Sequence, residues 1–203
     1  RQVVHTAVVD LNNPYTKVIA GYKGMLPESG NYGVQSTSVQ ALEAEKLGYG
    51  NVVVATNTTL SWYTHQYYKD NPHLIGEPLG YTILDGEMYY NSGWTYNEET
   101  KTFKKHAADS TQTVIVINYD EHPLTGETRP ADMPKVWIRN TTDPLTGWEE
   151  QAIPVSFALL VKPDENGNPV NLSKKEDHGS SVASRTFVGV KAGDVLDVNV
   201  NEA

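Results

Sequence analysis

The sequence contains no cysteine, no long apolar run and no excess of positive charge. The absence of cysteine excludes disulfides, thiolate catalysis and cysteine-ligated zinc. No run of residues is long and apolar enough to cross a bilayer as a helix. The formal net charge of -9 argues against a nucleic-acid binder, because phosphate contacts need a basic surface. The net negative charge of the protein would repel an anionic substrate, so binding one would need positively charged side chains at the site itself.

The usual signatures of metal and nucleotide sites are missing as well. The 6 histidines are scattered along the chain and do not show the helical HExxH spacing of a zinc protease. The sequence has no phosphate-binding glycine loop and no GxSxG nucleophile elbow. We therefore predict neither a metal nor a cofactor.

The length of the chain and its predicted secondary structure favour one β-rich domain. The 203 residues suffice for one sizeable core, and we expect a single domain over residues 1–203. One helix is predicted at Ser38–Leu47, with Thr37 as N-cap, Gln40 completing a capping box and Gly48 ending it. One helix among many strand-like segments predicts an α+β fold with a mixed or antiparallel sheet and few helices.

The strand-like segments run along the whole chain. Weak alternation at Gln2–Asp10 and Tyr15–Tyr22, around the turn Asn12-Asn13-Pro14, predicts an opening hairpin. Later strands are expected at Gln112–Tyr119, Lys135–Arg139, Ile153–Val161, Arg185–Lys191 and Val195–Val200. The last two of these would form a closing hairpin.

Residues 93–148 have a different character and are predicted to form a β-rich insertion or extended hairpin. The segment begins with a hairpin at Trp94–Lys105. It then carries the same four residues twice, Pro-Leu-Thr-Gly at 123–126 and again at 144–147. These copies predict two similar turns on either side of a short strand.

The stretch Asn51–Asn91 is the one around which the rest is organised. We predict a buried strand in the apolar run Val52–Ala55, then an aromatic loop, then a hairpin turned at Asp85-Gly86. A loop rich in aromatic and titratable groups after a buried strand suits a small polar ligand. The alternative is an ordinary connection whose aromatic side chains pack on the flank of the domain.

Three charged residues are candidates for chemistry. Glu77 and Asp85 lie on either side of one short strand and could form a carboxylate pair, although Asp85 also suits a simple Asp-Gly turn. Arg185 begins an apolar strand after a long polar loop, where its planar fork of donors could bind phosphate. The alternative for Arg185 is a surface ion pair with Glu176 or Asp177.

An ordered set of motifs resembles the phosphodiester glycosidase family, which includes the lysosomal uncovering enzyme. The set begins with Ala55-Thr56-Asn57 after an apolar strand, followed by Gly76-Glu77-Pro78-Leu79-Gly80 and the Asp85-Gly86 turn. It continues with the strand Phe157–Lys162 and with Arg185-Thr186-Phe187-Val188-Gly189, which matches the family motif at all but one position. Apart from residues 93–148, the resemblance covers nearly the whole chain.

The resemblance implies hydrolysis of a sugar-1-phosphodiester of the N-acetylglucosamine-1-phosphodiester type. Arg185 would then clamp the phosphate and Asn57 would hydrogen-bond the sugar or phosphate. The further residues that the resemblance suggests are Glu77, Asp85 and His178 for water or proton handling, and Trp62, Tyr63 and Thr186 for substrate binding.

The chain also departs from the family pattern. Thr58 to Trp62 replace the residues that usually follow the family's asparagine, and the family's C-terminal part of the domain is absent. A second polypeptide could carry that part. We therefore expect a secreted or cell-surface bacterial hydrolase domain acting on a cell-envelope or host glycan. The alternatives are a catalytically inactive relative serving as a carbohydrate-binding or structural surface module, and an unrelated β-rich adhesin fragment.

Overall fold

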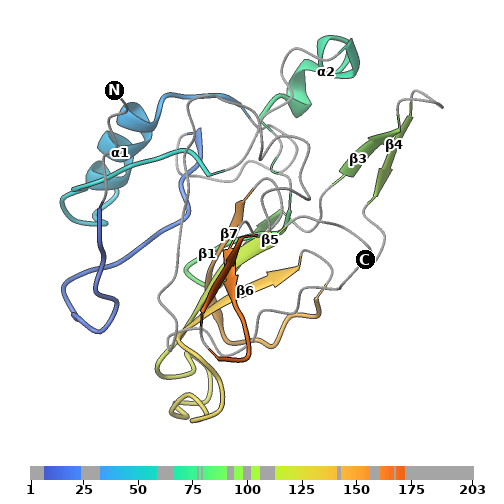
Figure 1. The fold of residues 1–203 in the computed structure, drawn as a ribbon. Coiled ribbons are helices and arrows are strands. Elements are labelled where there is room, and N and C mark those ends of the chain that lie inside the picture. Colours follow the sequence, from blue (N-terminus) through green and yellow to red (C-terminus); the bar gives the residue numbers. More distant parts are fainter. Residues whose placement is uncertain are drawn as a thin grey trace, which may run out of the picture.

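The computed structural model describes residues 7–23, 33–58, 66–76, 78, 80–90, 94–97, 102–105, 113–140, 143–155, 161–166 and 168–171. At its centre lies a five-stranded antiparallel sheet with the strand order β2-β1-β7-β5-β6 (Figure 1). The strands are β1 (Thr82–Leu84), β2 (Glu87–Tyr90), β5 (Thr113–Asn118), β6 (Val136–Asn140) and β7 (Glu149–Val155). With one ten-residue helix beside it, this sheet confirms the predicted β-rich α+β class.

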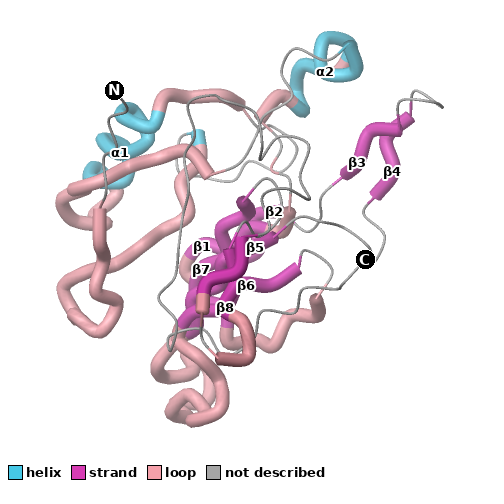
Figure 2. The backbone as a smooth tube through the Cα atoms, viewed as in Figure 1, coloured by secondary structure: helices cyan, strands magenta, loops and turns pink. Residues whose placement is uncertain are grey.

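The core is built on both faces of β5. Every residue of this strand is buried, as expected for a continuous β-branched run inside a sheet. On one face Val114 and Val116 pack with residues of β1 and β7 and with the partly buried Trp137. On the other face Ile115 and Ile117 pack with residues of β6, β7 and the N-terminal segment. Figure 2 shows these strands gathered at the centre, with loops around them.

Helix α1 (Thr37–Lys46) forms one residue earlier than predicted. Its N-cap is Ser36, whose side chain accepts a hydrogen bond from the Val39 backbone amide. Gly48 follows the helix with φ of 91°, as predicted for a glycine at a helix end. The helix buries Ala44 against Leu84 of β1.

The remaining described helices are a five-residue α2 (Gln66–Asp70) and a 3-10 turn (Pro72–Leu74). Within the described residues, no helix has the length and apolar character needed to cross a membrane.

The predicted opening hairpin is wrong for the residues that the structure describes. Residues 7–23 contain the predicted turn at Asn12-Asn13-Pro14, but no strand. The apolar residues of this segment instead contact the central sheet: Val18 packs against the Ile115 face, and Ile19 packs beside Ala44 and Leu84. Side-chain packing of this irregular segment against the sheet explains the weak alternation without any strand pairing.

The predicted buried strand at Val52–Ala55 is also wrong. Residues 51–58 are irregular, and Val53 is 91% exposed. Val52 alone packs, beside Ala44 and Leu84, and its amide donates to Glu45 Oε1 over 2.8 Å. The five strands of the sheet pair with one another and none of them pairs with this segment. An apolar run can suggest a strand, but it does not supply the partner that a buried strand requires.

Two other predicted hairpins, the one turned at Asp85-Gly86 and the one at Trp94–Lys105, are confirmed. Thr82–Leu84 pairs with Glu87–Tyr90 across the Asp85-Gly86 turn, and β3 (Trp94–Asn97) pairs with β4 (Thr102–Lys105). A further hairpin joins β8 (Val161–Pro163) to β9 (Pro169–Asn171). In Figure 1 the β3–β4 hairpin projects away from the central sheet.

The other strand predictions have mixed outcomes. The predicted insertion, residues 93–148, supplies β5 and β6 to the central sheet. The predicted strand Ile153–Val161 is divided between the end of β7 and the start of β8, and residues 156–160 lie outside the described part. The predicted closing hairpin lies outside it as well.

Candidate functional site

Two of the eight predicted site residues lie in the described part of the chain. Asn57 is an exposed residue of the irregular segment that follows α1. Asp85 is at the tip of the β1–β2 hairpin. The others lie outside the described residues: Glu77, Arg185, His178, Trp62, Tyr63 and Thr186.

Asp85 occupies a backbone position that an aspartate tolerates well. Its φ is 51° and that of Gly86 is 80°, so both central residues of the turn are left-handed. This is the arrangement of a type I′ turn, which matches the twist of the flanking strands and favours Asp-Gly. The tight turn fixes the position of Asp85 at the tip of the hairpin.

Three donors from distant parts of the chain converge on that carboxylate. Lys17 Nζ donates to Asp85 Oδ1 over 2.6 Å, and Gln151 Nε2 donates to the same oxygen over 2.9 Å. The Tyr49 hydroxyl also hydrogen-bonds Asp85. Gln151 is fully buried and accepts a hydrogen bond from the Ala20 backbone amide over 3.2 Å. Asp85 thus connects the N-terminal segment, the end of α1 and the central strand β7.

A second carboxylate completes the cluster. Glu150 Oε1 lies 3.0 Å from Lys17 Nζ, so one ammonium group bridges two carboxylates. The Glu150 carbonyl accepts from the Gly86 amide over 2.9 Å. The Tyr119 hydroxyl lies above the turn, where a Cβ added to Gly86 would come within 2.6 Å of it. We call Lys17, Tyr49, Asp85, Tyr119, Glu150 and Gln151 the Asp85 cluster.

The electrostatics of the cluster fix its protonation near neutral pH. Burial opposes ionisation of Asp85, but hydrogen bonds from Lys17, Tyr49 and Gln151 outweigh burial and lower its pKa. Burial also opposes the charged form of Lys17 and by itself would lower its pKa. The hydrogen bonds that Lys17 donates to Asp85 and Glu150 outweigh burial, so its pKa is raised. Burial, aided by the Asp85 carboxylate, raises the pKa of Tyr49 to about 12. The cluster therefore holds an ionised aspartate, a charged lysine and a neutral tyrosine.

This arrangement limits what Asp85 can do chemically. An ionised carboxylate that already accepts from three donors cannot give up a proton as a general acid. It can hold the hairpin in place and present a fixed negative charge. Within the described residues no three His, Asp or Glu side chains come together as a metal site would require.

Sequence reasoning singled out Asp85 but missed its partners. Lys17 and Gln151 are 68 and 66 residues away from it in the chain. Neither position carries a motif, so no local signal could have found them. The Asp-Gly turn was the sole indication in the sequence that this place is structurally constrained.

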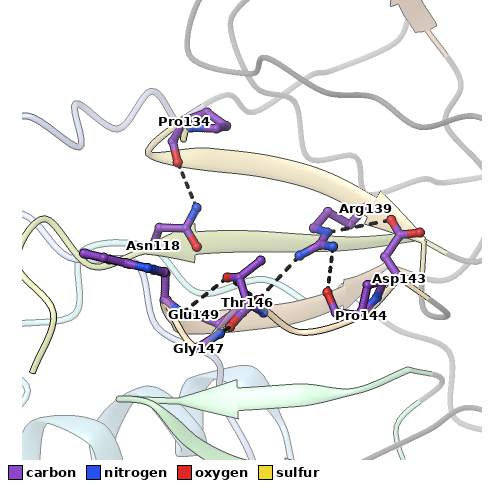
Figure 3. A network of polar contacts seen from close by, with 9 residues as sticks. Asn118, Pro134, Arg139, Asp143, Pro144, Thr146, Gly147 and Glu149 are labelled. Carbon is purple, nitrogen blue, oxygen red and sulfur yellow. Dashed lines mark hydrogen bonds and ion pairs between the residues drawn. The ribbon is translucent and has the colours of Figure 1, made fainter. Parts of the chain in front are cut away.

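A second polar network lies where β6 and β7 are joined by the second Pro-Leu-Thr-Gly turn (Figure 3). The Glu149 side chain is 3% exposed and accepts from the Thr146 amide over 2.7 Å and from the Gly147 amide over 2.8 Å. Arg139 Nη1 donates to Glu149 over 3.4 Å, and Nη2 donates to the Pro144 carbonyl over 2.7 Å. Glu149 thereby fixes the turn onto the sheet.

The first Pro-Leu-Thr-Gly turn is held differently. There His122 Nδ1 accepts from the amides of Leu124 and Thr125 over 3.2 and 3.3 Å. The Thr125 hydroxyl donates to Glu127 over 3.1 Å. The two copies are therefore both turns, as predicted, but only the second is held by a buried ion pair within the described residues.

Comparison with known proteins gives no relatives from which to transfer a function: the chain matches no family model, no curated protein and no solved structure.

Proposed function

We propose that the chain is a phosphodiester-glycosidase-like domain that hydrolyses a sugar-1-phosphodiester, of the N-acetylglucosamine-1-phosphodiester type, in a cell-envelope or host glycan outside the cell. The observation that carries the proposal is the order of three sequence motifs. Ala55-Thr56-Asn57 comes first, the segment from Gly76 to the Asp85-Gly86 turn second, and Arg185-Thr186 third. Each motif is weak by itself, and their shared order over most of the chain is the support.

The geometry of the second motif is compatible with this proposal. Gly76 has φ of 93°, and a Cβ at this position would come within 2.4 Å of the Gly33 carbonyl oxygen. Pro78 and Gly80 are buried and lead directly into β1. A motif that requires glycine at a close backbone approach and ends in a constrained Asp-Gly turn suits a part of the chain that positions other groups.

In this hydrolysis, a cation that stabilises the departing phosphate contributes more to catalysis than a proton donor does. The leaving group of a sugar-1-phosphodiester is a phosphate ester, which departs readily without strong acid catalysis. Stabilisation of its negative charge matters more, and Arg185 is the proposed clamp. Asn57 would hydrogen-bond the sugar or phosphate. Because Asp85 is ionised and engaged by three donors, we assign it a positioning role in this scheme.

The decisive experiment measures sugar release from UDP-N-acetylglucosamine or another N-acetylglucosamine-1-phosphodiester. Wild-type protein, in its longest available form, is compared with Arg185→Ala and Arg185→Lys. We expect turnover in the wild type, its loss in the alanine variant, and only partial recovery with lysine, which lacks the planar fork. Undiminished turnover in Arg185→Ala would refute the role of the clamp. Absence of turnover in the folded wild-type protein would refute the proposed hydrolase activity.

A second candidate function is a non-catalytic module that binds carbohydrate or builds a cell-surface structure. It is favoured by the Asp85 cluster, in which Asp85, Lys17 and Gln151 are engaged in joining segments of the chain. Under this proposal Asp85→Asn would lower stability and change no activity. Glycan binding by wild-type protein that shows no hydrolysis would support it, and sugar release that depends on Arg185 would exclude it.

A further inference from the structure

The first Pro-Leu-Thr-Gly turn, residues 123–126, is closed by a histidine side chain. The Nδ1 atom of His122 accepts from the backbone amides of Leu124 and Thr125 over 3.2 and 3.3 Å. A ring nitrogen that accepts a hydrogen bond carries no proton, so the imidazole is neutral and its proton lies on Nε2. The closed turn therefore requires the neutral form of His122.

The backbone at the base of the turn is held together without that side chain. The His122 amide donates to the Glu127 carbonyl over 2.8 Å, and the Gly126 amide donates to the His122 carbonyl over 2.9 Å. Neither bond involves the imidazole. Loss of the two bonds to Nδ1 would therefore release the tip of the turn, residues 123–125, and leave its base closed.

Acidic residues flank the imidazole within its own hairpin. His122 and Glu127 are opposite each other at the base of the turn, and the side chains of such cross-strand pairs lie on one face. The Glu127 carboxylate reaches back to the turn, where its Oε2 accepts from the Thr125 hydroxyl over 3.1 Å. Glu121 precedes the histidine and pairs with Thr128. A protonated imidazole would therefore have a carboxylate nearby to stabilise its charge.

The element packed against the imidazole is the stretch that leads into β7. Trp148 contacts the ring in a T-shaped arrangement, with 4.9 Å between the ring centroids and 79° between the planes. An indole does not titrate in water, so this contact adds no charge. The nearby acids have partners of their own: Glu149 holds the second turn, Glu150 belongs to the Asp85 cluster, and Asp120 pairs with two cations. Protonation of the histidine therefore acts mainly within its own hairpin.

The second Pro-Leu-Thr-Gly turn, residues 144–147, uses a different kind of acceptor. There the Glu149 carboxylate accepts from the Thr146 and Gly147 amides over 2.7 and 2.8 Å. A glutamate is ordinarily ionised throughout the range in which a histidine changes its charge. The same four residues are thus held by a carboxylate in one copy, and by a group that titrates near neutral pH in the other.

We propose that the first Pro-Leu-Thr-Gly turn is a proton-controlled surface loop, which His122 closes at about pH 8 and releases at about pH 5. Because the closed turn accepts only the neutral imidazole, added protons shift the population toward a released tip. In the released state the amides of Leu124 and Thr125 bond water. Leu124, which is 90% exposed, is then no longer held in one orientation. This device does not depend on the proposed hydrolysis.

The test follows individual backbone amides by NMR between about pH 8 and about pH 5. The sample is the ¹⁵N-labelled 203-residue chain, and the imidazole C–H signal of His122 is recorded in the same samples. The amides of Leu124 and Thr125 should titrate with the same midpoint as the imidazole. Their protection against solvent exchange, relative to the unfolded chain at the same pH, should fall about fivefold, because each loses one hydrogen bond. The Thr146 and Gly147 amides are the internal control and should keep their protection.

The matched variant is His122→Asn. An asparagine Oδ1 accepts hydrogen bonds from backbone amides two residues on, much as the histidine Nδ1 does here, and it does not titrate. This variant should keep Leu124 and Thr125 protected at both pH values. His122→Ala removes the acceptor, so it should show low protection at both. The chain has 6 histidines, and either variant also assigns the imidazole signal of His122.

The proposal fails if His122 titrates while the protection of the Leu124 and Thr125 amides stays constant. It fails as well if His122→Asn shows the pH response of the wild type, which would assign that response to an acidic group such as Glu127. An equal loss of protection at the second turn would also overturn it, since acid would then loosen both turns irrespective of the histidine.

Discussion

Replacing Gln151 by glutamate would test whether the Asp85 cluster joins the segments of the fold. Gln151 is fully buried, accepts from the Ala20 amide and donates to Asp85 over 2.9 Å. The substitution Gln151→Glu keeps the shape and the acceptor for Ala20. It replaces the amide that donates to Asp85 with a second carboxylate. Two carboxylate oxygens then face each other, and the hydrogen bond between residues 151 and 85 is lost.

The expected loss of stability can be worked out from two contributions. The lost hydrogen bond to a charged and partly exposed group costs about 1 kcal/mol. Burial beside Asp85 raises the pKa of the new carboxyl group by about 2, which corresponds to about 3 kcal/mol when that group is ionised. We therefore expect a total loss of about 3 to 4 kcal/mol at pH 7, a large part of the stability of an ordinary domain.

The pH dependence gives the sharper test. A carboxyl group with a raised folded-state pKa destabilises the protein above that pKa, and the penalty decreases as pH falls and the group becomes protonated. Once protonated, the introduced carboxyl group could again donate to Asp85. Urea unfolding followed by circular dichroism should therefore show a large deficit at pH 7 that shrinks by about 2 kcal/mol near pH 5.

The matched control is Gln35→Glu. Gln35 Nε2 donates to Glu43 Oε1 over 3.0 Å, so the exchange of groups is the same, but the pair is only partly buried. Solvent should limit its cost to about 1 kcal/mol. The reasoning fails if Gln151→Glu is as stable as the wild type at pH 7. It also fails if both variants lose the same stability with the same pH dependence.

Three further predictions concern other contacts. Glu149→Gln should cost about 2 kcal/mol in urea unfolding, because it removes the buried carboxylate that accepts from Arg139 and from two turn amides, although Asp143 remains 3.7 Å from Arg139. A cost below the detection limit would contradict this. Gly86→Ala should cost more than Gly48→Ala: both have positive φ, so each loses about 1 kcal/mol, but only at Gly86 would the new Cβ meet a tyrosine hydroxyl within 2.6 Å. Equal melting temperatures would contradict that steric argument. Lys17→Met should cost at most about 1 kcal/mol at pH 7, since the ion pair is exposed. That difference should vanish toward about pH 2, where Asp85 becomes protonated, since its pKa is lowered. It should also vanish above about pH 11, where Lys17 loses its charge, since its pKa is raised. A deficit in stability that is constant over this range would contradict the assignment.

Elements whose determinants are local could be predicted from the sequence. The Asp85-Gly86 hairpin follows from two residues that tolerate positive φ between alternating strands. The helix Thr37–Lys46 follows from a polar N-cap and a terminal glycine, and its start differs by one residue because Ser36 caps as well as Thr37 does. The β5 strand follows from its uninterrupted β-branched run.

Features that need a partner from elsewhere in the chain were decided by the tertiary structure. Val52–Ala55 is as apolar as β5, but it pairs with no strand of the sheet and Val53 remains exposed. The segment before Tyr22 alternates like a strand and instead lies across the sheet through side-chain contacts. Periodicity reports which residues avoid water, and it does not report what covers them.

The candidate site shows the same division. The sequence by itself determined that residue 85 would lie in a tight turn, because Asp-Gly chemistry is local. Only the tertiary structure brought Lys17, Tyr49 and Gln151 to that carboxylate. The sheet order places β7 beside β1, and the N-terminal segment contacts both strands. The physical reason is that a hydrogen bond between residues more than 60 positions apart depends on how the whole chain packs, and no short stretch of sequence encodes it.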